Sequence, residues 1–497
     1  MINNLLNIEI ITASRRRKII FVLTITLLFT IINLLFISQN IYVVSCFPLI
    51  LIFAIILLYR LDIAFYLAIF LTPLSFQLKF EEFNLGVSLP SELILASIML
   101  LFFFKFFIDK PINKKFIKNP LSVFILFHII WMFLVTLTSQ IHIVSAKYSI
   151  MQLWFIVPLY FFGYHIFKEK KRIYIYLFLL IIAVVLTIFY TTVHHSMYNF
   201  AEKSGNWAMR PFYNDHTMYG AILALLLPVT LGLGYVSKTS VKVKIFIYLS
   251  AFFMILGIFL SHSRATWISI AASIIFFVIL RYKIKLKYIL FTVIAFSVIS
   301  FVSYDAFIDY LKKNRQDSSQ YFVEHVQSIA NITTDASNLE RINRWKAAFG
   351  MIKDYPVFGS GPGTYQFLYA PYQHSKDRTI ISTNVGDLGN AHSEYISPLV
   401  ERGFLGLLFF LGIIISTYIV GIKAYQKTNN SEYKMLIICL LTGLFSYLTH
   451  GFLNNFLDSD KASVIFWGFI CIIVTLSIKI NEEETSMRIN SHFANFA

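Results

Sequence analysis

Two arginines and one histidine of this sequence stand directly beside long apolar runs, where ionisable side chains are costly. Arg210 precedes one run, Arg264 lies between two runs that are almost joined, and His392 precedes a third. The planar guanidinium of arginine forms paired hydrogen bonds with phosphate, and its charge does not titrate away. Histidine exchanges protons near neutral pH. Together these residues predict a site for an anionic ligand with a proton acceptor beside it.

Each of these residues also has a purely structural interpretation. An arginine near the hydrocarbon boundary can extend its side chain to water. This explanation suits Arg210 better than Arg264, because a turn of a few residues leaves Arg264 little freedom and polar side chains surround it. His392 is one of twelve histidines and can be an interfacial residue with a satisfied partner. The three residues alone leave both interpretations open.

Other kinds of catalytic site lack the residues that they need. The glycine-rich segment 359–363 has no following lysine, so a turn is predicted there rather than a nucleotide phosphate loop. The sequence has neither paired cysteines nor a His-x-x-x-His motif, so it does not predict a structural metal. We therefore expect neither a bound metal nor a cofactor.

The composition requires lipid as the solvent for much of the chain. Of the 497 residues, 57% are hydrophobic and 14% are charged, against about a quarter charged in soluble domains. The mean hydropathy is +0.69. These values exclude a soluble protein, and a disulfide scaffold is excluded because each of the three cysteines lies inside an apolar run. The formal charge of +16 is explained by membrane topology, so no nucleic-acid partner is expected.

The apolar runs predict fourteen membrane spans, or twelve full spans with two short or re-entrant ones. The connecting segments alternate between rich and poor in lysine and arginine. Because short cytoplasmic loops carry the basic excess, fourteen spans place both termini and every basic cluster in the cytoplasm. The predicted spans lie near residues 19–38, 42–59, 63–77, 91–108, 121–138, 148–166, 173–193, 217–235, 244–261, 265–281, 287–304, 402–421, 435–450 and 462–478.

The predicted fold is an all-α polytopic membrane protein with one large extracytoplasmic, partly helical loop. Residues 1–304 form an N-terminal bundle of about eleven spans, with both arginine motifs at its outer face. Residues 305–401 form the loop that carries His392. Residues 402–479 form the C-terminal spans, and residues 480–497 form a cytoplasmic tail.

Two helices are predicted around the end of this loop. Apolar residues at helical spacing, Ile342, Trp345, Phe349 and Ile352, predict an amphipathic helix that ends at Asp354. We expect this helix to lie against the membrane surface. A second helix is expected to begin at Pro398, with Ser397 as its cap.

Four segments of the sequence resemble the motifs of one known family, the O-antigen ligase and polymerase superfamily. His392–Gly406 is similar to its signature of a histidine, a short helix and a Glu-x-Gly-x-x-Gly turn into a span. Ser263–Ala265 resembles its Ser-Arg motif, Arg210–Gly220 its upstream Arg/Asn segment, and Arg341–Gly363 its loop helix and glycine turn. The order and spacing of the segments also agree.

The resemblance implies a glycan transferase on a GT-C-like multispan scaffold, without metal or nucleotide sugar. It implies transfer of a glycan from undecaprenyl diphosphate to a hydroxyl acceptor. Arg210 and Arg264 then hold the donor diphosphate, and His392 removes the proton of the acceptor hydroxyl, with inversion at the anomeric carbon. Arg341 is a candidate for binding the sugar chain. Glu401 and Asn390 are candidates for support of the loop-to-span junction, and structural salt bridging is equally open for Arg341 and Glu401.

The resemblance of the two arginines and the histidine to the ligase branch favours a ligase that transfers the glycan to the lipid A core, at the periplasmic side of a bacterial cytoplasmic membrane. A polymerase that extends another lipid-linked glycan is the nearest alternative, and a protein glycosyltransferase is a third. A lipid-linked glycan flippase belongs to a different class, and it predicts ionisable residues near mid-membrane and internal repeats. The expected partners are the lipid-linked donor, the glycan or lipid acceptor and membrane lipids. The sugar, the acceptor and the oligomeric state are not defined by the sequence.

Overall fold

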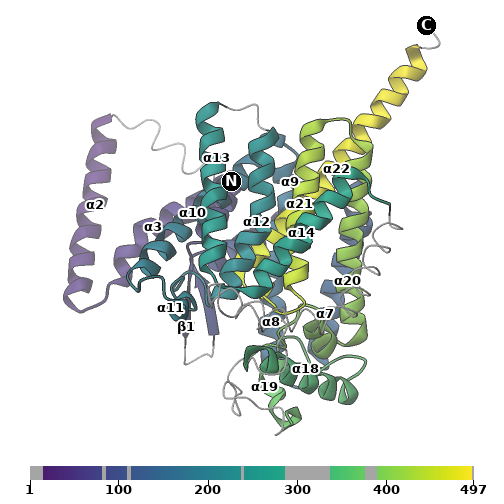
Figure 1. Ribbon diagram of the computed structural model, residues 1–497. Helices are drawn as coiled ribbons and strands as arrows, with labels where there is room; N and C mark the ends of the chain where they lie inside the picture. Colours follow the sequence, from purple (N-terminus) through teal and green to yellow (C-terminus); the bar gives the residue numbers. More distant parts are fainter. Residues whose placement is uncertain are drawn as a thin grey trace. The chain divides into compact units, whose positions relative to one another are not determined.

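The chain divides into two units, which are described separately. The computed structural model describes residues 15–80, 85–108, 113–236, 240–285, 336–374 and 389–494. The first unit is Met1–Ala64 and the second is Phe65–Ala497. The first contains α2 (Arg15–Ser38), the 3-10 helix η1 (Val43–Cys46) and α3 (Phe47–Tyr59), and α4 (Leu61–Leu71) begins at its end (Figure 1). All the candidate site residues lie in the second unit.

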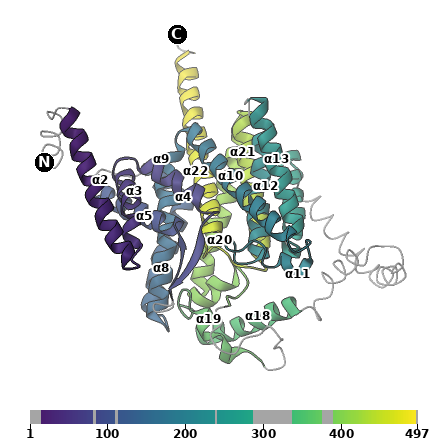
Figure 2. The same cartoon turned by 90° about the vertical axis from the view of Figure 1, so that its left-hand side faces the viewer.

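The second unit is a bundle of helices with one small hairpin. Figure 2 shows most of the long helices side by side, with α18 and α19 together at one end of them. After α4 its elements are β1 (Phe76–Phe80), β2 (Leu85–Leu89), α5 (Ser91–Ile108), α6 (Lys114–Ile117), α7 (Pro120–Leu137), α8 (His142–Ile156), the π-helical η3 (Val157–Phe162), α9 (Gly163–Phe167), α10 (Lys170–Ser196), α11 (Glu202–Gly205), α12 (His216–Val236), α13 (Val241–Leu260), α14 (Arg264–Tyr282), α18 (Ala336–Asp354), α19 (Tyr365–Leu368), the 3-10 helix η4 (Ala370–Tyr372), α20 (Ile396–Lys427), α21 (Ser431–His450) and α22 (Asp460–Ala494).

Ten helices within the described ranges are long and apolar enough to cross a membrane, and each coincides with a predicted span. Three other predicted spans, near 42–59, 63–77 and 91–108, contain shorter apolar helices. The predicted span 287–304 lies outside the described residues. Residues 305–335 of the predicted loop lie outside them too. The prediction of an all-α polytopic membrane protein is confirmed, whereas the GT-C-like scaffold stays a prediction.

The predicted third span, near 63–77, is wrong in its second half. Helix α4 ends at Leu71, and the chain then enters the antiparallel hairpin β1–β2. Ser75 and Ser91, at the two ends of the hairpin, both donate to Oδ2 of Asp460 at 2.6 Å. A search for long apolar stretches passes over this hairpin, although the alternation of apolar and polar residues in Phe76–Phe80 is a strand signal.

Helices α22 and α12 form the interior of the bundle. The most apolar window of α22 is 94% buried and that of α12 is 83% buried, whereas that of α14 is only 22% buried. A helix that is apolar on all sides is suited to such a buried position. Helix α12 packs against α13, α14 and α21, and α20 packs against α7, α21 and α22. The ends of these helices, on which the candidate site is built, are therefore fixed by protein packing.

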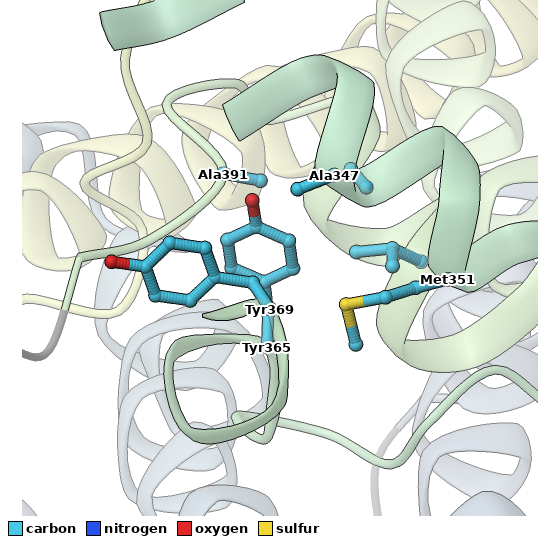
Figure 3. Packing of buried hydrophobic residues seen from close by; sticks show 7 residues of the cluster. Ala347, Met351, Tyr365, Tyr369 and Ala391 are labelled. Atoms are coloured by element: carbon cyan, nitrogen blue, oxygen red, sulfur yellow. The ribbon is translucent and has the colours of Figure 1, made fainter. Parts of the chain in front are cut away.

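Helix α18 covers the start of α20 through a small core of its own. Ala347, Ala348 and Met351 of α18 are buried against Tyr365, Tyr369, Ala391 and Val400. Figure 3 shows Tyr365 and Tyr369 side by side, with Ala391 next to them and Ala347 and Met351 on the neighbouring helix. The two tyrosine rings stack with centroids 5.2 Å apart. Because Ala391 precedes His392 in the chain, this core anchors the loop that carries the histidine.

The predicted amphipathic helix exists and ends at Asp354, as the sequence indicated. Its buried face, however, is the one with Asn343, Arg344, Ala347 and Met351. The predicted apolar stripe keeps partial exposure, and Phe349 is 50% exposed. Contact of this stripe with the membrane surface stays a prediction.

Candidate functional site

The ends of three long helices meet on the side of the bundle where α18 lies. The N-termini of α12 and α14 and the C-terminus of α21 are brought together because α12 and α14 both pack along α21. Gly220 of α12 makes this approach close, since a Cβ there would lie 3.1 Å from Ser261 Oγ and would collide with Thr266. These termini bring His216, Arg264 and His450 into one region.

Asp215 caps α12 and lies at the centre of this region. Its Oδ1 accepts from Thr217 N at 2.8 Å, Thr217 Oγ1 at 2.6 Å and Met218 N at 2.8 Å. The carboxylate therefore satisfies free N–H groups of the first turn. Asp215 also interacts electrostatically with His216, His392 and His450. It thus links three histidines that come from different parts of the chain.

Two arginines face the same histidines. Arg264 is the first residue of α14 after the capping residue Ser263, and it interacts electrostatically with His216. Arg341 of α18 interacts with His216, His392 and His450, and its Nε donates to Leu453 O at 3.1 Å. The site is therefore cationic, and two helix N-termini add to its positive potential.

Arg210 lies on the segment that precedes α12. Its side chain is exposed, and its Nε donates to Asn214 O at 3.2 Å. Within the described ranges, Arg210 is not among the charged groups that act on His216, His392 or His450. It lies at the start of the same segment, so its predicted contact with the donor stays a prediction.

His392 is held in a tight turn immediately before α20. Its backbone N–H donates to Asn390 Oδ1 at 3.0 Å, and its φ of +48° lies in the left-handed region. Burial and the repulsion of the imidazolium by Arg344 and Arg341 lower the pKa of His392 to about 4, against weaker opposite effects of carboxylates. The ring is therefore neutral at pH 7 and able to accept a proton.

Asn390 and Glu401 have structural partners at this junction. The Asn390 amide donates to Asn455 Oδ1 at 2.8 Å, and Glu401 Oε1 accepts from Tyr365 N at 3.2 Å. Glu401 is buried, and through this bond it holds the glycine turn against α20. Among the described residues, it makes no contact with the three histidines. Their predicted roles in support of the junction stay predictions.

The segment 359–363 is a turn that packs backbone to backbone on α20. Ser360 N donates to Val400 O at 3.0 Å, and Gly361 N donates to Glu401 O at 2.9 Å. Gly359, Gly361 and Gly363 have φ values of +71°, +117° and +73°, which glycine adopts without a steric cost. Gly403, with φ +67°, bends α20 where it meets this turn.

The start of α20 differs from the sequence prediction. The helix begins at Ile396, and Ser393 Oγ accepts from Tyr395 N at 3.3 Å and from Ile396 N at 3.4 Å. Ser397 accepts instead from the Asn455 amide at 2.8 Å. The prediction of Ser397 as the cap is therefore wrong, because two serines four residues apart offer equal local signals and a distant loop decides between them.

Four residues of this region were not predicted: Asp215, His216, Arg344 and His450. A usable signal existed for His216 and His450, since each stands at the end of an apolar run on the same side as Arg264. Arg344 carries no such signal, because its contacts with the Asn390 carbonyl and the Tyr369 ring come from tertiary packing. In the part of the chain that the structure describes, no group of His, Cys, Asp or Glu side chains is arranged to hold a metal ion.

These features define a multi-pass α-helical membrane protein with a cationic, histidine-containing site where helix ends meet. Residues 249–411 match the family model described as O-antigen ligase. The resemblance to the O-antigen ligase and polymerase superfamily, which the motifs indicated, is thereby confirmed. The matched range contains Arg264, Arg341, Asn390, His392 and Glu401.

One curated relative is an uncharacterized protein of Haemophilus influenzae. It is 22% identical to this chain over 255 residues, which is 51% of this chain and 62% of the relative. The similarity thus spans less than two thirds of that protein's length.

Proposed function

We propose that this protein transfers a glycan from undecaprenyl diphosphate to a hydroxyl acceptor and that the lipid A core is the acceptor. The observation that carries the proposal is the grouping of Arg264 and Arg341 with a neutral His392 where α12 and α14 begin. The family match supports the ligase or polymerase class. The donor, the acceptor and the site are part of the proposal.

The arginines and the helix N-termini supply binding for a diphosphate. Arg264 and Arg341 both act on His216, so an anion beside His216 has two guanidinium groups within electrostatic reach. Free N–H groups at a helix start and the helix dipole also favour an anion. This charge stabilises the leaving diphosphate as the glycosidic bond breaks. Arg210, exposed in the preceding segment, is proposed to contact the donor at the rim of the site.

His392 acts as the general base. The acceptor hydroxyl oxygen attacks the anomeric carbon, and its proton passes to the neutral imidazole of His392. The bond from that carbon to the diphosphate oxygen breaks, and its electron pair leaves with undecaprenyl diphosphate. Because the displacement is direct, the anomeric configuration is inverted. Arg264 and Arg341 remain charged throughout, so one proton transfer balances the reaction.

The charge distribution supports a site on the extracytoplasmic side. Helix α14 carries Arg264 at its site end and Arg281 at the other, and α21 carries His450 at its site end and Lys434 near the other. The segment that joins α9 to α10 is also basic and lies at the end of α10 opposite to Ser196. Basic loops stay in the cytoplasm, so the site faces the periplasm of an inner-membrane protein.

Reconstitution tests the transferase proposal. The purified protein in vesicles receives a lipid-linked glycan and a lipid A core acceptor, and release of undecaprenyl diphosphate is measured. We expect release together with glycosylated lipid A core. Movement of the donor between leaflets without its consumption would indicate a transporter, and longer lipid-linked chains without acceptor modification would indicate a polymerase.

A further inference from the structure

Arg344 is buried on the inner face of α18 in one fixed orientation. Its side chain is 7% exposed, and its Nε donates to Glu340 Oε1 at 2.7 Å, one helical turn earlier. Its guanidinium lies 5.1 Å from the centroid of the Tyr369 ring. An unpaired buried charge is strongly destabilising, and the ion pair and the ring face offset that cost. The head group therefore has little freedom to turn elsewhere.

This orientation directs Arg344 at the turn that carries His392. Its Nη1 donates to the backbone carbonyl of Asn390 at 3.2 Å. The chain at Gly389 lies so close to the guanidinium that an added Cβ would collide with it. The side chain of the same Asn390 accepts from the backbone N–H of His392 at 3.0 Å. A continuous path of contacts thus runs from Arg344 through Asn390 to His392.

The turn needs such support because its backbone is strained. His392 has φ +48°, and the left-handed region is sterically unfavourable for a residue with a side chain. The Asn390 side chain supplies one local hydrogen bond, and Arg344 fixes the carbonyl of the same residue. Ala391, which lies between Asn390 and His392 in the chain, is buried in the core with Tyr365 and Tyr369 (Figure 3). The imidazole therefore receives its position from α18 and from this core.

Arg344 also affects the charge state of the imidazole. Four charged groups act on His392: Arg344, Arg341 and Glu340 from α18, and Asp215 from the start of α12. After burial itself, Arg344 contributes most to lowering the pKa of His392 to about 4, and Arg341 contributes next. Asp215 and Glu340 act in the opposite direction. The cation of Arg344 thus favours the neutral ring, the form that accepts a proton.

We propose that Arg344 is the positioning residue of His392, which it holds in place through the Asn390 carbonyl. The proposal rests on the proposed transferase function, in which His392 is the general base. In this proposal Arg344 is not a catalytic residue. It acts through the placement and the charge of the histidine.

The test compares two substitutions of Arg344 in the full chain, reconstituted in vesicles with lipid-linked donor and acceptor. R344Q removes the charge, so the pKa of His392 rises from about 4 toward its ordinary 6.5. The rate at about pH 5 should then fall by roughly twofold to tenfold relative to the rate at about pH 8. R344K keeps the charge but loses the planar fork, so the rate should fall roughly tenfold at every pH. The KM for the donor should stay unchanged in both variants.

A matched control removes a different charge from the same helix. Lys353 lies near the end of α18 and is exposed, so K353Q should leave the pH profile in place. If R344Q does not fold, E340Q/R344Q removes both charges of the buried pair. The acidic limb should still move to higher pH in that variant, because Arg344 acts on His392 more strongly than Glu340 does.

A second measurement does not depend on turnover. Exchange of the imidazole C2 hydrogen, followed by mass spectrometry of the peptide with His392, reports the pKa of that ring alone. We expect a higher midpoint in R344Q and an unchanged one in K353Q. If wild-type protein consumes no donor, the proposed function fails, while the exchange still tests the effect of Arg344. An active wild type with equal pH profiles and equal exchange midpoints in R344Q would overturn the proposal for Arg344.

Discussion

The side-chain amide of Asn390 donates to the side-chain oxygen of Asn455 at 2.8 Å, and so joins the loop before α20 to the loop after α21. The same amide donates to the Asn455 carbonyl at 3.2 Å. Asn455 in turn donates to Ser397 Oγ at 2.8 Å. The segments that carry His392 and His450 are therefore one connected structure.

Asn390→Ala removes these bonds together with the one that holds the His392 backbone. A displacement of about 1 Å at a reacting group can cost roughly a hundredfold in rate. We expect turnover to fall roughly tenfold to a hundredfold while the KM for the donor stays the same, as measured by release of undecaprenyl diphosphate. Asn430→Ala is the control, because Asn430 caps α21 at its other end. That change should cost about 1 kcal/mol of stability and leave turnover unchanged. Equal turnover of the two variants would contradict the prediction.

Much of this architecture could be predicted because hydropathy is a local signal. The ten long helices, the end of α18 at Asp354 and the proximity of Arg264 and His392 to helix ends all follow from residue type and spacing. The hairpin β1–β2 lies outside this prediction, because a search for long apolar stretches passes over strands of five residues, even where they alternate between apolar and polar residues.

The details of the site depend on contacts between distant segments. The sequence paired Arg210 with Arg264, which stays a prediction, and it gave no sign that the packing of α18 brings Arg341 as well as Arg264 to act on His216. The buried face of α18 contains Asn343 and Arg344, which a hydrophobic pattern assigns to the solvent side. The local partner Glu340 on the same helix, together with the tertiary partners Gln373 and the Asn390 carbonyl, makes that face suitable for burial.

Lysine substitutions should rank the three arginines by their contact with the diphosphate. Arg264→Lys and Arg341→Lys keep the charge but lose the paired hydrogen bonds, so donor affinity should fall roughly tenfold or more. Arg210→Lys should change it less, because Arg210 is exposed and bonded to a backbone carbonyl. Competition by undecaprenyl diphosphate for labelled donor measures all three, and Arg172→Lys at the opposite end of the bundle is the control. A loss of affinity that is largest for Arg210→Lys would favour the pairing of Arg210 with Arg264.

Asp458→Asn should change how stability depends on pH. Burial and the nearby Glu394 and Glu401 raise the pKa of Asp458 from 3.8 to about 7. Between these two values the folded protein binds a proton that the unfolded chain has released, so wild-type stability falls as pH rises toward 7. Since Asp458 keeps partial exposure, we expect the variant to gain about 2 kcal/mol over wild type at pH 8 and almost nothing at pH 4. Thermal unfolding in detergent measures the difference. An equal offset at both pH values would show that Asp458 does not titrate in this range.

The last prediction separates two histidines that share a region but have different roles. His392→Ala removes the general base, so turnover should fall roughly a hundred- to ten-thousandfold while donor binding persists.

His450 is 1% exposed, its Nδ1 lies 3.4 Å from the Asn454 amide nitrogen, and its Nε2 has no hydrogen-bond partner among the described residues. An amide nitrogen can only donate, so Nδ1 accepts and Nε2 carries a hydrogen.

That Nε2–H is a donor near Arg341 and Asp215, and a phosphate oxygen of the bound lipid would satisfy it. His450→Phe keeps the ring volume but removes the donor, so donor affinity should fall roughly tenfold. His450→Gln, which retains an N–H, should recover part of it. Binding of labelled undecaprenyl diphosphate together with single-turnover rates distinguishes the two histidines. If His392→Ala weakens binding as much as His450→Phe does, or if it retains normal transfer, His392 is not the base and the mechanism is wrong.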